Sequence, residues 1–373
     1  MNKRHYIIPI FVPHLGCPHD CVFCNQRKIA TSEENMDEVK AISIIEEHLS
    51  TINPDNSTIE VSFFGGTFTA IPMEKQKELL AVAARYKDAG KIDYIRMSTR
   101  PDYIDEDILN HLKKFKVDII ELGVQSLDEI VLFASGRGHK KEDVYKASKL
   151  IKEFGFILGH QIMLGLPGDN RKKDIETAIE SLSLSPDICR IYPALVIKNT
   201  PMEVMYKRGI YKPYSLEEAV DICKDIYSLY SSKGVAVIRI GLQATDNINV
   251  NGDIVDGPFH PSFRELVESS LIKDMLLYNL KNKTGDYELR INNRYISRLY
   301  ANKKNYFNEL KNEIKEITLK VKIDNEVPIG EIFLDCKGST LRLSLKDYTD
   351  FVANKLIRNI VPLKSNPMNK ILH

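Results

Sequence analysis

One short stretch near the start organises this sequence: Pro13-His-Leu-Gly-Cys17-Pro-His-Asp-Cys21-Val-Phe-Cys24-Asn-Gln-Arg-Lys-Ile29. It places three cysteines in a C-x3-C-x2-C pattern directly after the apolar run Tyr6–Val12. Thiolates are the usual ligands of iron–sulfur clusters, and a four-iron cluster ordinarily takes four of them. Only three are local, and no second Cys or Cys/His cluster follows. We therefore predict that Cys17, Cys21 and Cys24 hold a four-iron cluster with one iron open to another ligand.

Two alternatives would use the same cysteines. A zinc site needs a fourth ligand, for which His14 and His19 are the candidates. Both are within three residues of Cys17 in the sequence, which is a crowded arrangement for tetrahedral zinc. A disulfide would leave an odd thiol and is more typical of secreted chains. The cluster is therefore the favoured interpretation.

Length and composition indicate a large globular chain. The 373 residues are 43% hydrophobic, enough for roughly two or three domains, or for one barrel with an appendage. Lys and Arg (52) nearly balance Asp and Glu (51), so a basic surface for nucleic acid would have to be local. No apolar stretch is long enough to span a membrane, and Tyr6–Val12 is too short for a signal peptide and is broken by Pro9. We expect a cytoplasmic protein without a membrane partner, and the six cysteines fit a reducing compartment.

From Tyr6 to about Leu242, short β-branched runs alternate with amphipathic helical stretches. Strands are expected at Tyr6–Val12, Thr58–Phe64, Tyr94–Ser98, Asp118–Val124, Ile157–Leu164, Ile188–Val196 and Val235–Leu242. Helices are expected at Asp37–Leu49, Met73–Ala89, Asp105–Phe115, Glu142–Glu153, Arg171–Leu182 and Ser215–Lys233. This alternation predicts an α/β fold with a parallel sheet and helices outside it. Six or seven such units favour a complete or partial (β/α) barrel, whose chemistry lies at the carboxyl ends of the strands.

The C-terminal part has a different pattern. Turn-forming residues fill 244–261, and a helix is expected at Pro261–Asn279. The period then becomes two, which predicts antiparallel strands of a small α+β extension at Tyr287–Ile291, Thr318–Ile323, Gly330–Leu334 and Thr340–Leu345, before a last helix at Lys346–Ile360. The expected domains are 1–242 for the partial barrel, 243–280 for the loop and connecting helix, and 281–373 for the α+β domain.

Polar and glycine-rich motifs follow several of the expected strands. After the second comes Phe63-Phe64-Gly65-Gly66-Thr67-Phe68-Thr69, whose paired glycines would let the backbone approach a ligand closely, or would simply make a tight turn. The third strand ends in Met97-Ser98-Thr99-Arg100-Pro101-Asp102-Tyr103. Its hydroxyls and Arg100 suit a ribose or a carboxylate, although Pro101 also fits a helix start.

The fourth and fifth units carry further polar groups. In Glu121-Leu-Gly123-Val-Gln125-Ser126, an acid and an amide would be costly to bury unless they face a polar site. Arg137, between two glycines and before His139, could reach inward as a bidentate carboxylate clamp; the alternative is a solvated basic turn. His160-Gln161 precedes a turn, Gly165-Leu-Pro-Gly168, that could present backbone groups to an adenine.

In this order the motifs resemble the radical S-adenosylmethionine (SAM) superfamily. With Arg190-Ile-Tyr-Pro193 added, they resemble over roughly residues 5–230 the radical SAM half of the Elongator catalytic subunit and its shorter bacterial relatives. The resemblance implies an enzyme that reductively cleaves SAM at a [4Fe-4S] cluster to a 5′-deoxyadenosyl radical and acts at the wobble uridine of tRNA, with acetyl-CoA as the carbon source. It also implies an electron donor such as ferredoxin or flavodoxin.

The resemblance also implies which residues contact SAM. Gly65, Gly66 and Thr67 would hold the amino group of its methionine part. Gln125 and Thr99 would contact the ribose, Arg137 the carboxylate, and Phe23 the adenine, with Gln161 completing the set.

Two features depart from the Elongator pattern. The Elongator subunit has a longer gap between its first two cysteines than the three residues between Cys17 and Cys21. The sequence also contains no Arg/Gln-x-x-Gly-x-Gly/Ala pyrophosphate turn of an acetyltransferase. If the chain modifies tRNA, either the added group does not come from acetyl-CoA or a partner supplies the acyl transfer.

The local charge balance bears on the substrate. Between Lys281 and Lys315, nine Lys and Arg residues stand against four acids, with tyrosines interleaved. Such a surface would suit RNA, with Arg290, Arg294 and Arg298 as candidate contacts, unless it is a solvated face whose tyrosines pack inward. A small-molecule substrate such as a tetrapyrrole, as in oxygen-independent coproporphyrinogen oxidase, and a non-enzymatic iron–sulfur or zinc scaffold are the alternatives.

Overall fold

The computed structural model describes residues 4–12, 17, 19–25, 36–243, 248–249 and 252–360. The chain divides into two compact units: Met1–Pro213 with Asp246–Gly257, and Tyr214–Thr245 with Pro258–His373. These limits differ from the boundaries expected at 242 and 280, because the last helix and strand of the barrel pattern group with the C-terminal segment.

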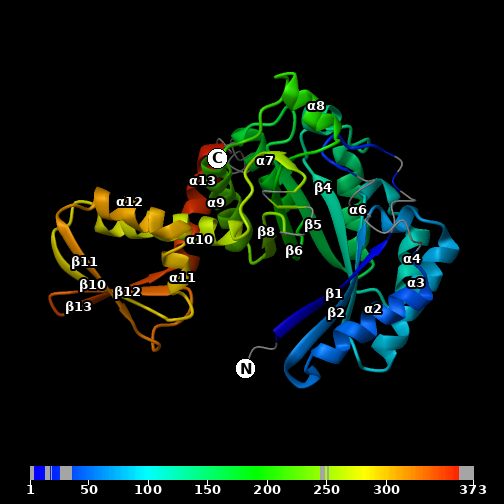
Figure 1. The fold of residues 1–373 in the computed structure, drawn as a ribbon, viewed down its shortest axis with the longest axis horizontal. Coiled ribbons are helices and arrows are strands. Elements are labelled where there is room, and N and C mark those ends of the chain that lie inside the picture. The colour runs from blue at the N-terminus through cyan, green and yellow to red at the C-terminus, as the bar shows by residue number, and fades with distance from the viewer. Residues whose placement is uncertain are drawn as a thin grey trace, which may run out of the picture. The chain divides into compact units, whose positions relative to one another are not determined.

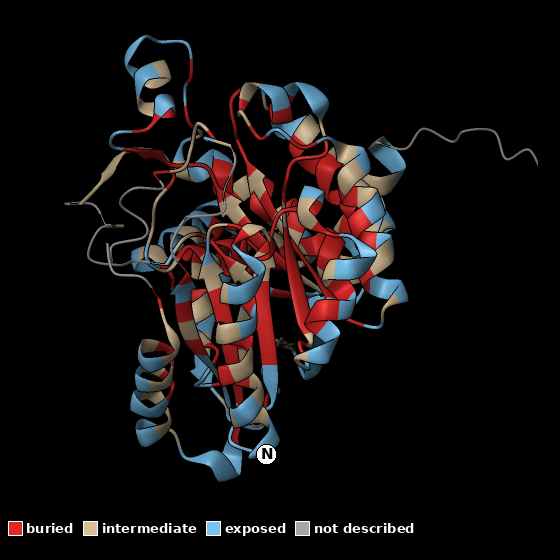
Figure 2. Ribbon diagram, turned by 90° about the vertical axis from the view of Figure 1, so that its right-hand side faces the viewer, coloured by how far each residue is buried: buried red, intermediate tan, exposed pale blue. Residues whose placement is uncertain are grey.

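A curled, mostly buried sheet dominates the structure (Figures 1 and 2). Its strand order is β1-β2-β3-β4-β5-β6-β8, and each described pair from β1 to β6 runs parallel. The strands are β1 (Arg4–Val12), β2 (Ser57–Gly65), β3 (Tyr94–Thr99), β4 (Ile119–Gln125), β5 (Ile157–Leu164), β6 (Ile188–Pro193) and β8 (Ala236–Ile240). The order leaves β1 and β8 as open edges, so the predicted partial barrel is confirmed.

Helices follow the strands, as the alternating pattern predicted. Those after β1 to β5 are α2 (Glu38–Thr51), α3 (Met73–Asp88), α4 (Glu106–Lys114), α6 (Lys141–Glu153) and α7 (Arg171–Ser183). The side chains of Asp37, Asp105 and Asn170 accept hydrogen bonds from the first turns of α2, α4 and α7. None of the described helices combines the length and the apolar character needed to cross a membrane.

Several short elements were not predicted. These are α5 (Glu129–Ala134), α8 (Pro201–Lys207), the 3-10 turns η1 (Pro54–Asn56), η2 (Phe68–Ala70) and η3 (Pro101–Tyr103), and the antiparallel pair β7 (Val196–Ile197) and β9 (Ile254–Asp256). The strand expected at Ile188–Val196 is therefore broken after Pro193. Each of these elements is too short to produce a hydrophobic period that the sequence could reveal.

The sheet has one apolar and one polar face. Ile59, Val61 and Phe63 of β2 alternate with Glu60 and Ser62, and all five are buried. On β5, the ring of His160 bonds to Ser148 Oγ of α6 (3.0 Å) and to Ser181 Oγ of α7 (2.7 Å), so it lies on the helix-covered face. Burial lowers the pKa of His160 to about 3, so the ring is a neutral part of the core. Because strand side chains alternate, Gln161 lies on the opposite, polar face.

The second unit contains α9 (Leu216–Ser232), β8, α10 (Phe263–Leu280), α11 (Ile296–Leu299), η4 (Asn302–Lys304), α12 (Asn305–Glu313) and α13 (Leu345–Ile360). Its own sheet has the order β11-β10-β12-β13. The strands are β10 (Gly285–Ile291), β11 (Ile317–Ile323), β12 (Glu331–Cys336) and β13 (Ser339–Ser344). The sheet was expected to be antiparallel, but β10 and β11 run parallel. The reason is the connection between them, which contains α11 and α12 and returns the chain in the same direction.

Candidate active site

The cysteine loop is fixed by hydrogen bonds on two sides. The backbone N–H of Val22 donates to the carbonyl of Ser135, directly after α5 (3.0 Å). The carbonyl of Val22 accepts from the N–H of Met202, at the start of α8 (2.9 Å). The side-chain amide of Asn25 donates to the carbonyl of Lys198 (2.8 Å). The loop is therefore held between the residue that follows α5 and the segment that follows β6.

The three thiols share one polar environment. Cys21 is buried, and Cys17 and Cys24 are half-buried. Thr67 Oγ1 lies 3.6 Å from the Cys17 sulfur, and Arg137 Nη1 lies 3.5 Å from the Cys21 sulfur. Burial, followed by the nearby Cys21 and Cys17, raises the pKa of Cys24 to about 12, and the charge of Arg137 opposes this rise. Neighbouring thiolates repel one another, as the effect of Cys21 and Cys17 on Cys24 indicates. The three sulfur ligands therefore suit a positively charged metal group.

A single metal ion would need several ligand atoms gathered around one point. Among the described residues, no three His, Cys, Asp or Glu side chains are placed to hold one metal ion. A four-iron cluster instead places each thiolate on a different iron, which separates the sulfurs more widely. His14, one candidate ligand of the zinc alternative, lies outside the described residues.

The glycine motif lies beside the end of β1. Gly65 has φ +118°, and a Cβ there would lie 2.3 Å from the carbonyl oxygen of Val12, its partner in the β1–β2 register. Only glycine fits this close approach. Thr69 Oγ1 lies 2.6 Å from Thr99 Oγ1, which ties the glycine motif to the end of β3. Gly65, Thr67 and Thr99, named separately from sequence, are thus on neighbouring strand ends.

The residues expected from β4 and β5 also meet. A bulge between Gly123 and Gln125 shifts the β4–β5 register, and Gln125 adopts φ +65°. Such bulges redirect a side chain at the end of a strand. Gln161 Nε2 lies 3.4 Å from Gln125 Oε1. Gly123 leaves room for Arg137, because a Cβ at Gly123 would be only 2.7 Å from Arg137 Nη2.

Two buried guanidinium groups have unused donors. Arg137 Nη2 donates to the carbonyl of Gly123 (2.6 Å), and Arg100 makes two 2.9 Å bonds to Asp102. Among the described residues, Arg137 Nε and Arg100 Nη1 are buried without an acceptor. Burial, followed by the charges of Arg137 and Arg100, lowers the pKa of His139 to about 2, so its ring is neutral. Buried donors are normally satisfied, and because no carboxylate of the described residues pairs with Arg137 in the ion pairs found, its Nε suits an anionic ligand group such as a carboxylate.

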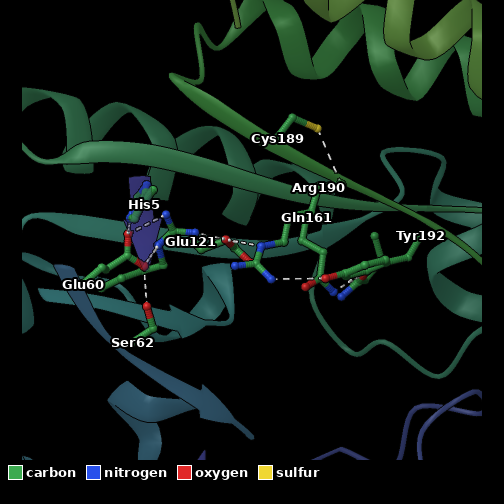
Figure 3. Close-up of polar contacts among 10 residues, drawn as sticks. His5, Glu60, Ser62, Glu121, Gln161, Cys189, Arg190 and Tyr192 are labelled. Carbon is green, nitrogen blue, oxygen red and sulfur yellow. Dashed lines mark hydrogen bonds and ion pairs between the residues drawn. The ribbon is translucent and has the colours of Figure 1, made fainter. Parts of the chain in front are cut away.

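A chain of buried ion pairs crosses the polar face of the sheet (Figure 3). Glu60 of β2 contacts His5 of β1 (3.0 Å) and Arg96 of β3 (2.7 Å), and Arg96 also reaches Glu121 of β4 (3.2 Å). Glu121 in turn contacts Arg190 of β6 (2.9 Å). The acids and guanidinium groups offset one another, so this polar face can be buried without unpaired charge.

The network reaches β6 across β5 because Gly159 lies between them. A Cβ at Gly159 would be 3.2 Å from Glu121 Cγ. At the far end, Arg190 Nη1 donates to the hydroxyl of Tyr192 (3.3 Å), and its guanidinium lies 5.2 Å from the ring centroid of Phe64. The sequence indicated that Glu121 needed a polar surrounding, but Arg96 and Gly159 were missed, because their partners depend on strand register.

The comparisons with known proteins agree with this geometry. The Radical SAM superfamily model matches residues 11–182, and the Radical_SAM C-terminal domain model matches residues 186–273. The first match contains the three cysteines, the glycine pair and Arg137. The chain belongs to the radical SAM superfamily. An iron–sulfur cluster and SAM are therefore the cofactors that its family implies, and the residues around the cysteine loop fit both groups.

The chain is similar in sequence to individual tRNA uridine(34) acetyltransferase and Elongator complex protein 3 sequences over part of its length. It is 32% identical over 300 residues to the tRNA uridine(34) acetyltransferase of Methanocaldococcus jannaschii, covering 70% of this chain and 54% of that protein. It is 29% identical over 203 residues to Elongator complex protein 3 of Saccharomyces cerevisiae, covering 49% of this chain and 36% of that protein. The chain thus spans about half or less of the length of these relatives. The structure of Methanocaldococcus infernus Elp3 shares the fold, with a TM-score of 0.59 at 23% identity over 92% of this chain and 78% of that one.

The three arginines expected to contact RNA differ in availability. Arg290 pairs with Asp324 (2.8 Å) and Asp335 (2.6 Å). Arg298 pairs with Glu265 and Glu268. Arg294 is exposed. Their role in RNA binding stays a prediction, but two of the three charges are offset within the chain.

We expect Glu60→Gln to lower the free energy of unfolding by about 3–5 kcal/mol at pH 7. The substitution removes the buried carboxylate that pairs with the Arg96 guanidinium. Burial alone would raise the pKa of Glu60, but the His5 hydrogen bond and the Arg96 charge outweigh it, and the pKa is lowered from 4.5. The carboxylate therefore stabilises the fold above its unfolded pKa, and this contribution disappears as the pH falls through the lower folded value. Urea unfolding of parent and variant at pH 7 and below 4.5 measures both effects.

Glu38→Gln is the matched control, because Glu38 pairs with Arg85 on the exposed surface and should cost less than about 1 kcal/mol. Equal effects of the two substitutions would contradict the role given to the buried network.

Proposed function

We propose that Cys17, Cys21 and Cys24 hold a [4Fe-4S] cluster, that SAM binds beside it, and that the chain modifies RNA, with tRNA as the substrate. The observation that carries the proposal is the placement of three thiols beside the buried guanidinium of Arg137, whose Nε lacks an acceptor among the described residues. A thiolate-bound cluster and the carboxylate of SAM would satisfy both requirements. When bound, these cofactors supply the low-potential electron and the 5′-deoxyadenosyl radical.

The chain's own residues would bind and orient SAM. Gly65 and Gly66 bring backbone close to its amino group, and Arg137 donates to its carboxylate through the free Nε. Thr99 and Gln125 contact the ribose. Gly65, Gly66, Thr99 and Gln125 are at the carboxyl end of a strand or directly after it, where barrel enzymes carry their ligands, and Arg137 follows α5.

Phe23 and Gln161 complete the SAM site. Phe23 packs against an apolar cluster of residues that includes Val131, Leu166 and Met202. This cluster gives the adenine a dry wall between the cysteine loop and the end of β5. Water excluded here would otherwise screen the charges on which SAM binding depends.

Two observations support an RNA substrate. The relative from Methanocaldococcus jannaschii described above is named tRNA uridine(34) acetyltransferase. In the second unit, Arg294, Lys303 and Lys304 are exposed, and Lys304 Nζ lies 4.5 Å from the ring centroid of Tyr300. Exposed cations beside an aromatic ring suit phosphate contact and base stacking. The given sequence has no acetyltransferase pyrophosphate motif, so for a tRNA substrate either the added group does not come from acetyl-CoA or a partner supplies the acyl transfer.

The cluster can be tested by metal content. Anaerobic reconstitution should give about four irons per chain, with a spectrum that changes when SAM is added. Cys24→Ala should abolish the cluster, whereas Cys336→Ala, a half-buried cysteine of β12, should retain it. Stoichiometric zinc in anaerobically purified parent protein would overturn the assignment, and so would full iron in the Cys24 variant.

The SAM site can be tested through the space at Gly123. Gly123→Ala should displace the Arg137 guanidinium and weaken SAM binding by about tenfold, with iron content unchanged. If it acts through Arg137, its effect and that of Arg137→Met should not add in the double variant. Calorimetric titration of SAM into all four proteins measures this. Full additivity, or no loss in Gly123→Ala, would remove Arg137 from the site.

The RNA substrate can be tested by salt dependence. Phosphate contacts release counterions, so the logarithm of tRNA affinity should fall linearly with the logarithm of salt concentration. Changing Arg294, Lys303 and Lys304 to Gln should reduce that slope by roughly two to three. Lys77, Lys91 and Lys116, exposed in the first unit, give a control of equal charge change. Salt-insensitive binding, or SAM cleavage stimulated by a tetrapyrrole and never by tRNA, would favour the small-molecule alternative.

A further inference from the structure

The inner side of the edge strand β1 exposes an aromatic ring. Ile8 and Ile10 are fully buried, whereas Phe11 is 51% exposed. Strand side chains alternate, so Phe11 lies on the same side of β1 as His5, whose ring bonds to Glu60 of the polar network (3.0 Å). A single exposed apolar residue is ordinary on the outside of a protein. This ring instead lies on the polar face of the sheet, which forms the interior of the partial barrel.

Phe11 and Phe64 form an aromatic pair at the carboxyl ends of β1 and β2. The two residues are partners in the β1–β2 register, and their ring centroids are 6.1 Å apart with 41° between the ring planes. Arg190 of β6 reaches the same place, since its guanidinium lies 5.2 Å from the centroid of the Phe64 ring. Aromatic rings and guanidinium planes are the surfaces on which proteins stack unpaired nucleobases. A further planar ring placed against Phe11 would extend this row.

Two hydroxyl groups adjoin the aromatic pair. Arg190 Nη1 donates to the hydroxyl oxygen of Tyr192 (3.3 Å; Figure 3). The proton of that hydroxyl group can therefore be donated elsewhere, and Tyr192 is only half-buried. Ser98 of β3 is also half-buried, and the β2–β3 register extended by one residue places it beside Phe64. Hydroxyl groups both donate and accept, so they suit the mixed carbonyl and N–H edge of a nucleobase.

The charges of this wall offset one another, which limits the kind of ligand that it can hold. The Arg190 guanidinium contacts Glu121 (2.9 Å), and Arg96 lies between Glu60 and Glu121. Two guanidinium groups thus face two carboxylates, with His5 at the far end of the network. A ligand that carries carboxylates, such as a tetrapyrrole, would meet no unpaired guanidinium in this described part of the sheet. A neutral planar ring fits the wall better.

The aromatic pair is next to the residues that would bind SAM. Phe64 directly precedes Gly65, and Phe11 directly precedes Val12, whose carbonyl oxygen would be 2.3 Å from a Cβ at Gly65. A ring held against Phe11 would therefore lie on the inner side of the same strand ends that carry the glycine motif. Hydrogen-atom transfer needs the two reacting groups in contact. The reacting part of a substrate would have to be held at such a place.

We propose that Phe11, Phe64 and Tyr192 bind the nucleobase that the enzyme modifies, stacked on the open Phe11 ring. Its polar edge would face the hydroxyl groups of Tyr192 and Ser98. The inference rests on the proposed RNA substrate and identifies the residues that would hold the reacting base. The contact itself changes no covalent bond. Because a base must leave its own stack to enter such a site, an unpaired nucleotide of an RNA loop is the substrate class that fits.

Photo-crosslinking tests this site directly. The probe is a stem-loop RNA that carries 4-thiouridine at one loop position at a time, because this base crosslinks only to groups in contact with it. Irradiation of the reconstituted chain with SAM should, for one loop position, link the RNA to a peptide that contains Phe11, Phe64 or Tyr192, as mapped by mass spectrometry. Phe11→Ala should reduce this crosslink and raise the Kd of the stem-loop by about tenfold. Its iron content and its Kd for SAM should match the parent.

A second variant tests the hydrogen-bonding edge. Tyr192→Phe removes only the hydroxyl group and should raise the Kd of the stem-loop by about fivefold, with the crosslinked peptide unchanged. Phe133→Ala, at an 88% exposed ring of α5, is the matched control for Phe11→Ala. Tyr86→Phe, which removes an exposed hydrogen bond to Glu46, is the control for Tyr192→Phe. Both controls should keep the parent's Kd and crosslink.

Three outcomes would overturn the inference and leave the proposed function standing. These are crosslinks confined to other parts of the chain, a Phe11→Ala variant with the Kd and crosslink of the parent, and equal losses in Phe11→Ala and Phe133→Ala. A parent that binds no stem-loop RNA even at low salt would instead contradict the proposed RNA substrate, and the inference with it.

Discussion

The peptide of Val22 is hydrogen-bonded on both sides, to Ser135 after α5 and to Met202 at the start of α8. These two bonds hold the middle of the cysteine loop, between Cys21 and Cys24, against segments that are more than a hundred residues away in sequence. The side chains of Val22 and Phe23 also pack against the apolar cluster that contains Val131 and Met202, so contacts with other segments determine the shape of the loop. The placement of Arg137 beside Cys21, and of Thr67 beside Cys17, follows from this docking.

The polar face of the sheet imposes a second constraint. Parallel sheets are ordinarily apolar on both faces, yet here Glu60, Arg96 and Glu121 are all buried. They are tolerated because each carboxylate meets a guanidinium across the neighbouring strand, and Gly159 lets Glu121 reach Arg190. The charges of this network therefore offset one another on the polar face of the sheet.

Much of this could be predicted from the sequence, because it depends on local pattern. The β–α alternation gave the strands and helices of the barrel, and C-x3-C-x2-C indicated the cysteine loop. Features that depend on register or on long-range pairing could not be predicted. Arg290 reads as a free cation in sequence but lies between Asp324 and Asp335. The parallel pairing of β10 with β11 depends on how the helical connection returns.

Of the two positions where only glycine leaves enough room, one could be predicted from the sequence and the other could not. Gly65 belongs to a recognisable motif, whereas the need for glycine at position 123 appears only when Arg137 is seen against it. Helix α5 was missed because six residues are too few to reveal a helical period.

The central proposal is that Cys17, Cys21 and Cys24 would hold a cluster and that Gly65 and Arg137 would bind SAM beside it. Electron–nuclear double resonance on the reduced protein tests it most directly, using SAM labelled with ¹⁵N in its amino group and ¹⁷O in its carboxylate. The structure predicts hyperfine coupling from both labels in the parent, because Gly65 and Arg137 would hold these groups beside the cysteine loop. A reduced four-iron spectrum that shows no coupling to either label at saturating SAM would contradict the account.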